Sequence, residues 1–135
     1  MPLAELIVNR ARSYIFTTAS TPADTAAALT ALEVLTSTEG AGLVARLRSH
    51  VERVRPGHGS PIVPVMCGDD ERALTAAAAL LERGLLVPAI RPPTVPAGTA
   101  RLRVALSAAH TGEQIERLVG SLVELGFLAG VTPVA

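Results

Sequence analysis

The sequence predicts an α+β fold in which about three antiparallel-type strands are covered by two helices and preceded by a long helix. Three observations predict it. From residue 62 onward, short apolar runs and helical periods follow one another as strand, helix, strand, strand, helix. Of the 135 residues, 49% are hydrophobic but only 2% are aromatic, which favours helices on a small sheet over an aromatic-rich β-sandwich. The length suits one domain with a real core.

The first half of the chain reads as mostly helical. Residues 3–13 have the apolar spacing of a short helix, and the aromatic and β-branched residues 14–18 predict a strand. Thr21 and Pro22 form a helix start, with a capping hydroxyl followed by proline at the first position. We expect one long helix over residues 21–55, with any break at Gly40 or Gly42.

Turn residues at 55–61 separate this helix from an apolar run at 62–67, whose Pro64 indicates an edge strand or a bulge. Asp69 and Asp70 place negative charge at the start of the next helix, and Gly84 ends it. Acidic pairs also bind metals, but no further ligands converge on this one, so we predict no metal site.

Residues 85–90 and 100–107 predict the second and third strands. In the third, Leu102, Val104 and Leu106 alternate with Arg101, Arg103 and Ala105, so the two arginines should project together from one face. Thr111 should cap the last helix and Gly126 should end it. Residues 129–135 show no periodicity, and we expect a loose tail.

Composition excludes several classes of function. The formal net charge is zero and no basic face with interleaved aromatics appears, which argues against nucleic acid as a partner. All twelve cationic residues are arginine, so the chain has no lysine for a Schiff base. A lone Cys67 suits a buried position in a reducing compartment. With no secretory leader or apolar run long enough to span a bilayer, we expect a cytoplasmic protein that does not enter the membrane.

The loop between the second and third strands predicts an anion site. Pro92, Pro93 and Pro96 stiffen it, and it carries Arg91 and leads to Arg103. Guanidinium groups hold carboxylates and phosphates through paired hydrogen bonds.

Five motifs in order carry a resemblance to a known family. They are RSYIFTTA at 12–19, SPI at 60–62, AIRPPTVP at 89–96, GTARLR at 98–103 and LSAAHT at 106–111. Together they resemble the C-terminal part of the 8-amino-7-oxononanoate synthases, which belong to the α-oxoamine synthase group and have the aspartate aminotransferase fold.

The resemblance implies pyridoxal 5'-phosphate as cofactor and the decarboxylative condensation of L-alanine with a pimeloyl thioester in biotin biosynthesis. It implies that residues 1–20 are a remnant of the large domain, 21–55 a connecting helix and 56–128 the small α+β domain. The family's Schiff-base lysine lies upstream of the matched region, so the chain alone should neither attach the cofactor covalently nor be active. We therefore assign no catalytic residue.

The resemblance also assigns site residues. Arg103 matches the arginine that binds the amino-acid carboxylate. Thr17 and Thr18 match a segment that, in the dimeric family, reaches the cofactor phosphate of the neighbouring subunit. Arg91, Pro92 and Pro93 are assigned only a shaping role at the substrate channel.

For the other polar residues, structural roles are favoured over catalytic ones. Arg101 is interpreted as a solvated charge, His110 as a hydrogen-bonding residue at a helix start, His58 as a loop residue and His50 as a residue on a helix surface. Two further hypotheses for the whole chain stay open. It could be a subunit of a split enzyme whose partner chain supplies the lysine, or a non-catalytic binding protein. A homodimer is a further expected assembly.

Overall fold

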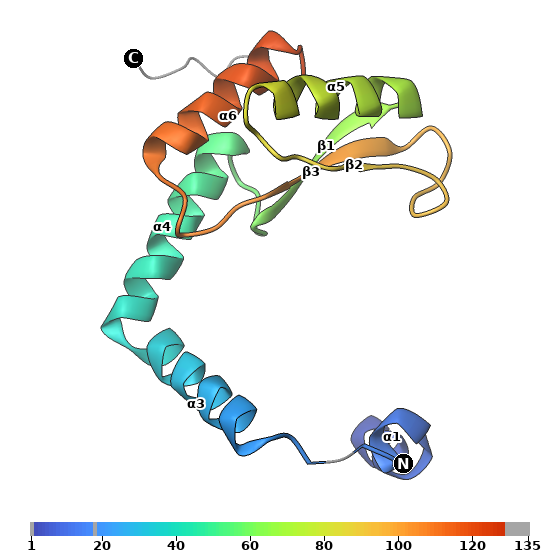
Figure 1. The fold of residues 1–135 in the computed structure, drawn as a ribbon, viewed down its shortest axis with the longest axis vertical. Coiled ribbons are helices and arrows are strands. Elements are labelled where there is room, and N and C mark those ends of the chain that lie inside the picture. Colours follow the sequence, from blue (N-terminus) through green and yellow to red (C-terminus); the bar gives the residue numbers. More distant parts are fainter. Residues whose placement is uncertain (1, 18, 129–135) are drawn as a thin grey trace. The chain divides into compact units, whose positions relative to one another are not determined.

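The computed structural model describes residues 2–17 and 19–128 (Figure 1). Its contacts divide the chain into two compact units, Met1–Gly40 and Ala41–Ala135. The division falls inside the first turn of helix α4 (Thr38–Val54). Each unit is described by itself.

The first unit holds helices α1 (Leu3–Arg10), α2 (Arg12–Ile15) and α3 (Pro22–Thr36). The strand expected at residues 14–18 is wrong over its described part, because Arg12–Ile15 is helical. The backbone amides of Tyr14 and Ile15 donate to the carbonyl of Ala11 at 3.0 Å, so local bonds replace a strand ladder. A β-branched or aromatic run forms a strand only where a neighbouring strand accepts it, and the described part of this unit contains none.

Helix α3 begins as expected. The backbone amide of Asp24 donates to the hydroxyl of Thr21 at 3.2 Å, and Pro22 occupies the first position. The helix ends earlier than expected, so the single helix over residues 21–55 is wrong and neither glycine marks the break. Ser37 does.

Ser37 joins the two helices through its backbone and its hydroxyl. Its extended backbone ends α3, and its hydroxyl donates to the carbonyl of Val34 at 2.7 Å. The same oxygen accepts the backbone amide of Gly40 at 3.2 Å, in the first turn of α4. A Cβ on Gly40 would overlap the carbonyls of Val34 and Leu35, so glycine permits the close approach of the two helix ends.

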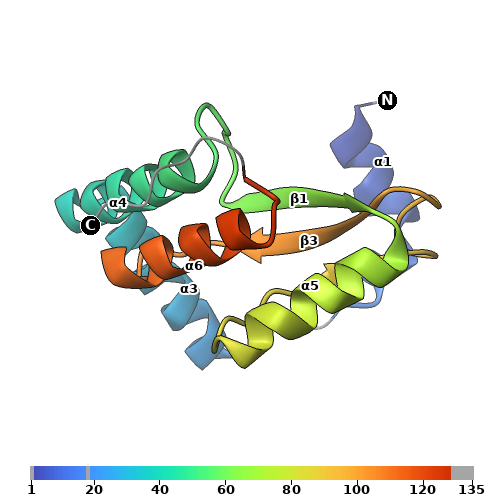
Figure 2. The same cartoon turned by 90° about the horizontal axis from the view of Figure 1, so that it is seen from above.

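The second unit is built on an antiparallel sheet with the strand order β1 (Ile62–Gly68), β3 (Ala100–Ala105), β2 (Ala89–Ile90). Helices α5 (Asp70–Glu82) and α6 (Gly112–Glu124) lie over the same face of it (Figure 2). The α+β prediction of a small sheet covered by two helices is confirmed. As expected, the strand with Pro64 lies at an edge, where a missing amide donor is tolerated.

The core lies between the sheet and the helices. Its most deeply buried large side chains come from both the sheet and the helices: Val63 of β1, Leu102 of β3, Val54 of α4, Leu80 of α5, and Val119 and Leu122 of α6. On β3, buried Leu102 and Val104 alternate with Arg101 and Arg103, as the sequence predicts.

The expected second strand is shorter than residues 85–90. The amide of Leu85 is used to close the end of α5 by donating to the carbonyl of Leu80 at 2.9 Å, and Pro88 has no amide to offer a ladder. Only Ala89–Ile90 pairs with β3.

The predicted end signals of α5 and α6 are confirmed. Asp69 accepts the amide of Arg72 at 2.7 Å at the start of α5. Thr111 and Gln114 form a reciprocal capping box at the start of α6. Gly84 and Gly126 follow the two helices with positive φ angles of 73° and 74°, which glycine adopts without strain.

An ion pair joins α4 to α6. The guanidinium of Arg53 donates to both carboxylate oxygens of Glu116, at 2.5 and 2.6 Å. This hydrogen bonding raises the pKa of Arg53 above its ordinary value, against a smaller opposing effect of desolvation. Among the described residues, no helix is long and apolar enough to cross a membrane.

Candidate carboxylate-binding site

The sheet face opposite α5 and α6 carries both arginines of β3. Arg103 lies across from Pro64 of β1, and its backbone amide donates to the carbonyl of Pro88 at 3.0 Å. Arg101 lies between Met66 of β1 and Ile90 of β2. The arginines are thus flanked by apolar side chains rather than by acidic partners.

A hollow of about 390 Å³ opens around these arginines on the same unit. It is lined by Ser60, Ile62, Pro64, Ile90, Thr94, Arg101, Leu102 and Arg103. No acidic residue belongs to this lining. Within the described residues, the guanidinium of Arg103 makes no hydrogen bond or ion pair and is exposed, so its fork is available to an anion.

Arg101 is half-buried, and part of its guanidinium already makes a hydrogen bond within the chain. Its Nε donates to the carbonyl of Thr99 at 2.9 Å, which leaves its two terminal NH₂ groups unpartnered in the part of the chain that the structure describes. The prediction that the two arginines project together is confirmed, and both reach one hollow.

The loop from 91 to 99 is held by short local bonds. The amide of Thr94 donates to the carbonyl of Arg91 at 3.1 Å, and Thr99 donates through its hydroxyl to the carbonyl of Pro96 at 2.7 Å. The Pro92–Pro93 peptide is cis. Arg91, Pro92 and Pro93 are not among the residues that line the hollow, whereas Thr94 is.

The residues assigned to the cofactor phosphate lie elsewhere. Thr17 is exposed in the first unit, and its hydroxyl donates to the carbonyl of Ser13 at 2.7 Å. Thr18 lies outside the described residues. Since Thr17 Oγ1 already has an acceptor and the sequence contains no lysine, the described residues alone do not form a site that fits pyridoxal phosphate. Within residues 2–17 and 19–128, no group of His, Cys, Asp or Glu could hold a metal.

The histidines have structural roles. His110 accepts the amide of Ser107 through Nδ1 at 3.1 Å, as expected for a residue at a helix start. His50, expected on a helix surface, is instead 8% exposed, and its Nδ1 lies 3.2 Å from the carbonyl of Ser107. Because this part of α4 packs within the second unit, the side of the helix that carries His50 is covered. His58 contacts the carbonyl of Ile62 at 3.0 Å.

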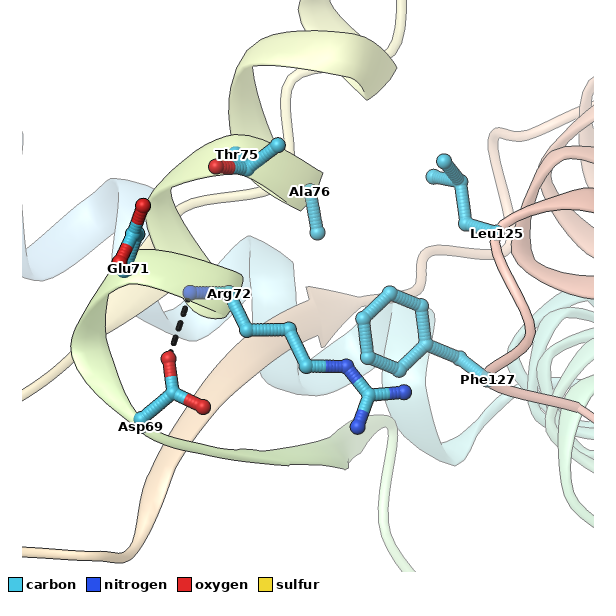
Figure 3. Close-up of a pocket in the computed structure, with 7 residues that line it drawn as sticks. All are labelled: Asp69, Glu71, Arg72, Thr75, Ala76, Leu125 and Phe127. Carbon is cyan, nitrogen blue, oxygen red and sulfur yellow. Dashed lines mark hydrogen bonds between the residues drawn. The ribbon is translucent and has the colours of Figure 1, made fainter.

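A second cavity, of about 380 Å³, lies between the start of α5 and the chain after α6 (Figure 3). The guanidinium of Arg72 lies 4.9 Å from the centre of the Phe127 ring, and Asp69 caps α5 through the amide of Arg72. These contacts attach the chain after α6 to α5, and they involve Asp69 and Arg72, two of the three charged residues that line the cavity. We assign no function to this cavity.

Sequence reasoning assigned no role to Ser60, Thr94 or Ile90, although all three line the hollow. Strand alternation could have placed Ile62 and Pro64 on the outward face. The strand register and the loop path, which bring Ser60 and Thr94 to the same place, are set by tertiary pairing.

No family model matches the chain. It is 50% identical over 131 residues to 8-amino-7-oxononanoate synthase of Janthinobacterium sp. (strain Marseille), a match that covers 90% of this chain and 33% of that protein. The chain corresponds to a C-terminal part of the 8-amino-7-oxononanoate synthase family. It spans about a third of the length of the curated relatives that it matches.

Solved structures agree with the family. A variant of serine palmitoyltransferase from S. paucimobilis with a bound PLP–myriocin aldimine superposes with a TM-score of 0.77 and 32% identity, covering 95% of this chain and 36% of that chain. An 8-amino-7-oxononanoate synthase from Francisella tularensis gives a TM-score of 0.69 and 26% identity, covering 93% and 40%. The expected fold is therefore confirmed, and the parent family is dependent on pyridoxal phosphate.

Proposed function

We propose that this chain supplies the amino-acid carboxylate site of a pyridoxal-phosphate-dependent acyltransferase of the 8-amino-7-oxononanoate synthase type. The reaction is the decarboxylative condensation of L-alanine with a pimeloyl thioester, in biotin biosynthesis. The observation that carries the proposal is the fork of Arg103, which has no partner among the described residues and lies in a hollow on the open sheet face.

The geometry of a guanidinium supports the role proposed for Arg103. A guanidinium binds both oxygens of a carboxylate in one plane, so it fixes the rotation of the amino acid as well as its position. The strand fixes the Cα of Arg103 through its pairing opposite Pro64. Arg103 thereby orients the bond to the carboxylate that leaves as carbon dioxide.

The remaining assigned residues have supporting roles. Thr17 and Thr18 donate hydrogen bonds to the cofactor phosphate of a neighbouring subunit in a homodimer, for which the hydroxyl of Thr17 must leave the carbonyl of Ser13. Arg91, Pro92 and Pro93 shape the substrate channel. The Schiff-base lysine comes from residues outside these 135, because none of the 135 is lysine. The location proposed for the assembled enzyme is cytoplasmic.

The absence of lysine also supports two other candidates. In the first, the chain is one subunit of a split enzyme and a separate polypeptide carries the lysine. In the second, it is a non-catalytic protein that keeps the carboxylate site. Assembly with a lysine-bearing region separates them, because only the first candidate needs it for function.

The test is alanine-dependent turnover of the chain assembled with the lysine-bearing region of a related synthase. We expect Arg103→Ala to lower kcat/KM for L-alanine by about 100-fold or more, since a charge-assisted pair is lost at the reacting group, while assembly is unchanged. The matched control is Arg117→Ala, an exposed arginine of α6 outside the hollow, which should keep normal turnover. Normal turnover of Arg103→Ala would show that the carboxylate binds elsewhere.

The chain alone provides a second check. Mixed with pyridoxal phosphate, it should give no visible absorbance band of a lysine-bound cofactor. Such a band from the chain alone would overturn the assignment.

A further inference from the structure

Strand β1 lies at an edge of the sheet, and β3 is its only neighbouring strand among the described residues. Its free side carries the backbone groups of alternate residues. The amide of Arg103 donates to Pro88 on the β2 side of β3, so Pro64, which faces Arg103, directs its own backbone groups away from the sheet. The alternation along β1 places the backbone groups of Ile62 and Met66 on the same free side.

Side chains already bind most of these groups. The guanidinium of Arg55 donates through Nη1 to the carbonyl of Pro64 at 3.0 Å, and Pro64 has no amide hydrogen. Nε2 of His58 lies 3.0 Å from the carbonyl of Ile62, and because a carbonyl only accepts, this nitrogen carries the proton. The hydroxyl of Ser60 accepts the amide of Ile62 at 3.2 Å. Ile62 and Pro64 therefore leave no backbone donor or carbonyl without a partner for an added strand.

The three capping side chains come from one turn, residues 55–60, which follows α4. The amide of His58 donates to the carbonyl of Arg55 at 3.2 Å, and the carboxylate of Glu52 in α4 accepts the amide of Gly57 at 2.9 Å. These bonds fix the turn on the end of α4. Arg55 and His58 are thereby held next to the edge of β1.

An open edge at β1 would be self-complementary. Antiparallel pairing of β1 with β1 of a second copy, centred on Pro64, places Ile62 of one copy opposite Met66 of the other. These two side chains are 52% and 50% exposed, and an exposed apolar strand at a sheet edge is a template for association.

We propose that the turn at 55–60 closes the free edge of β1 to strand pairing with a second copy of this chain. A strand that adds must first displace Arg55 and His58, and at Pro64 it meets no amide donor. The inference does not depend on the proposed function, because neither Arg55 nor His58 lines the hollow around Arg103.

The test is association of the full chain in a background from which another route to association has been removed. Leu32→Glu and Leu35→Glu provide this background, because both leucines of α3 are exposed. In it, we expect Arg55→Ala together with His58→Ala to raise the association constant by about tenfold or more, since two carbonyls become free to accept from an added strand. Light scattering over a concentration series measures the constant.

Hydrogen exchange locates the contact. As the concentration of this variant rises, amides between residues 62 and 66 should gain protection, whereas those of α6 should not change. Arg55→Lys, with His58 unchanged, still donates to a carbonyl and should behave as the background chain. The matched control is Arg46→Ala, which removes the same charge from an exposed position of α4 and should leave association unchanged.

Three outcomes overturn the inference. They are an unchanged association constant when both caps are removed, an equal rise in Arg46→Ala, and association without added protection at residues 62–66. Slow labelling of the buried Cys67 shows that a variant is folded. If the variant without both caps does not fold, Arg55→Ala and His58→Ala are measured singly, each with an expected rise of about threefold, and no rise in either equally overturns the inference.

Discussion

At the scale of the residue, burial changes the acidity of the Cys67 thiol in β1. Its thiol is 5% exposed, between the sheet and the helices, and Sγ contacts the carbonyl of Val65 at 3.5 Å. Desolvation raises the pKa of Cys67 above its ordinary value, and the backbone of Leu102 opposes this only in part. A buried neutral thiol is a poor nucleophile, so Cys67 is a core residue, as the sequence predicts.

The sign of this shift gives a pH dependence. The pKa of Cys67 is higher in the folded chain than in the unfolded chain. The contribution of the neutral Cys67 thiol to stability is therefore complete below the unfolded pKa and is lost as pH rises through the folded pKa. We expect the free energy of unfolding to fall at alkaline pH, and a thiol reagent at pH 8 to label Cys67 much more slowly in the folded chain than in denaturant. Denaturant titrations at pH 7 and above the thiol pKa measure the first effect.

The matched variant is Cys67→Ala, which should lose that part of the alkaline decrease. Rapid labelling of the folded chain at pH 8 would contradict the burial of this thiol.

At the scale of elements, the junction of α3 and α4 depends on Gly40, and Gly42 in the same helix provides a comparison. A Cβ at Gly40 would overlap backbone carbonyls of Val34 and Leu35, whereas a Cβ at Gly42 would meet nothing within 4 Å. We expect Gly40→Ala to destabilise the junction by about 1 to 3 kcal/mol, the usual result of overpacking. Gly42→Ala, in the same helix, should stabilise α4 by about 0.5 to 1 kcal/mol, since alanine is the better helix former.

Hydrogen exchange of the amides from 34 to 44 measures both effects locally. Protection of the Gly40 amide, which donates to Ser37 Oγ, should fall in Gly40→Ala and not in Gly42→Ala. Equal protection in the two variants would show that the helix ends do not approach as described.

The sequence predicts the elements whose signals are local. Thr111 and Gln114 predict the start of α6, and Gly126 predicts its end. The alternation along β3 places Arg101 and Arg103 on one face. The predictions that are wrong concern segments whose structure depends on contacts with other parts of the chain. Tyr14 and Ile15 have strand propensity but no neighbouring strand in the described part of their unit, and Ser37 ends α3 through bonds to both helices that a propensity scale does not contain.

The candidate site divides in the same way. Arg103 could be chosen from the sequence, because a motif and a strand face both point to it. The hollow could not, since Ser60 and Thr94 reach it from separate loops through the pairing of β1 and β2 with β3. The sequence alone favours a solvated charge at Arg101, because the cavity that it shares with Arg103 is visible only in three dimensions.

At the scale of the whole molecule, the two units differ in how much they bury. The core side chains belong to Ala41–Ala135, whereas α3 has no buried residue. Three leucines at three-residue spacing, Leu29, Leu32 and Leu35, are 58%, 57% and 61% exposed, and Val34 lies on another side of the helix. A helix that is apolar on more than one side is normally covered by other protein.

We therefore expect the chain by itself to bind an apolar fluorescent dye and to associate as its concentration rises. Leu32→Glu and Leu35→Glu together should remove most of the dye signal, because they interrupt the stripe that the three leucines form. The control is Leu86→Glu, which replaces a single leucine of the second unit that is 83% exposed and should change the signal little.

The denaturation midpoint of the second unit should be the same in the parent chain and the α3 double variant, because α3 contributes nothing to that core. Light scattering across a concentration series then measures association directly. A parent chain that stays monomeric and binds no dye would show that the leucines of α3 are covered within the chain, in a state other than the one described.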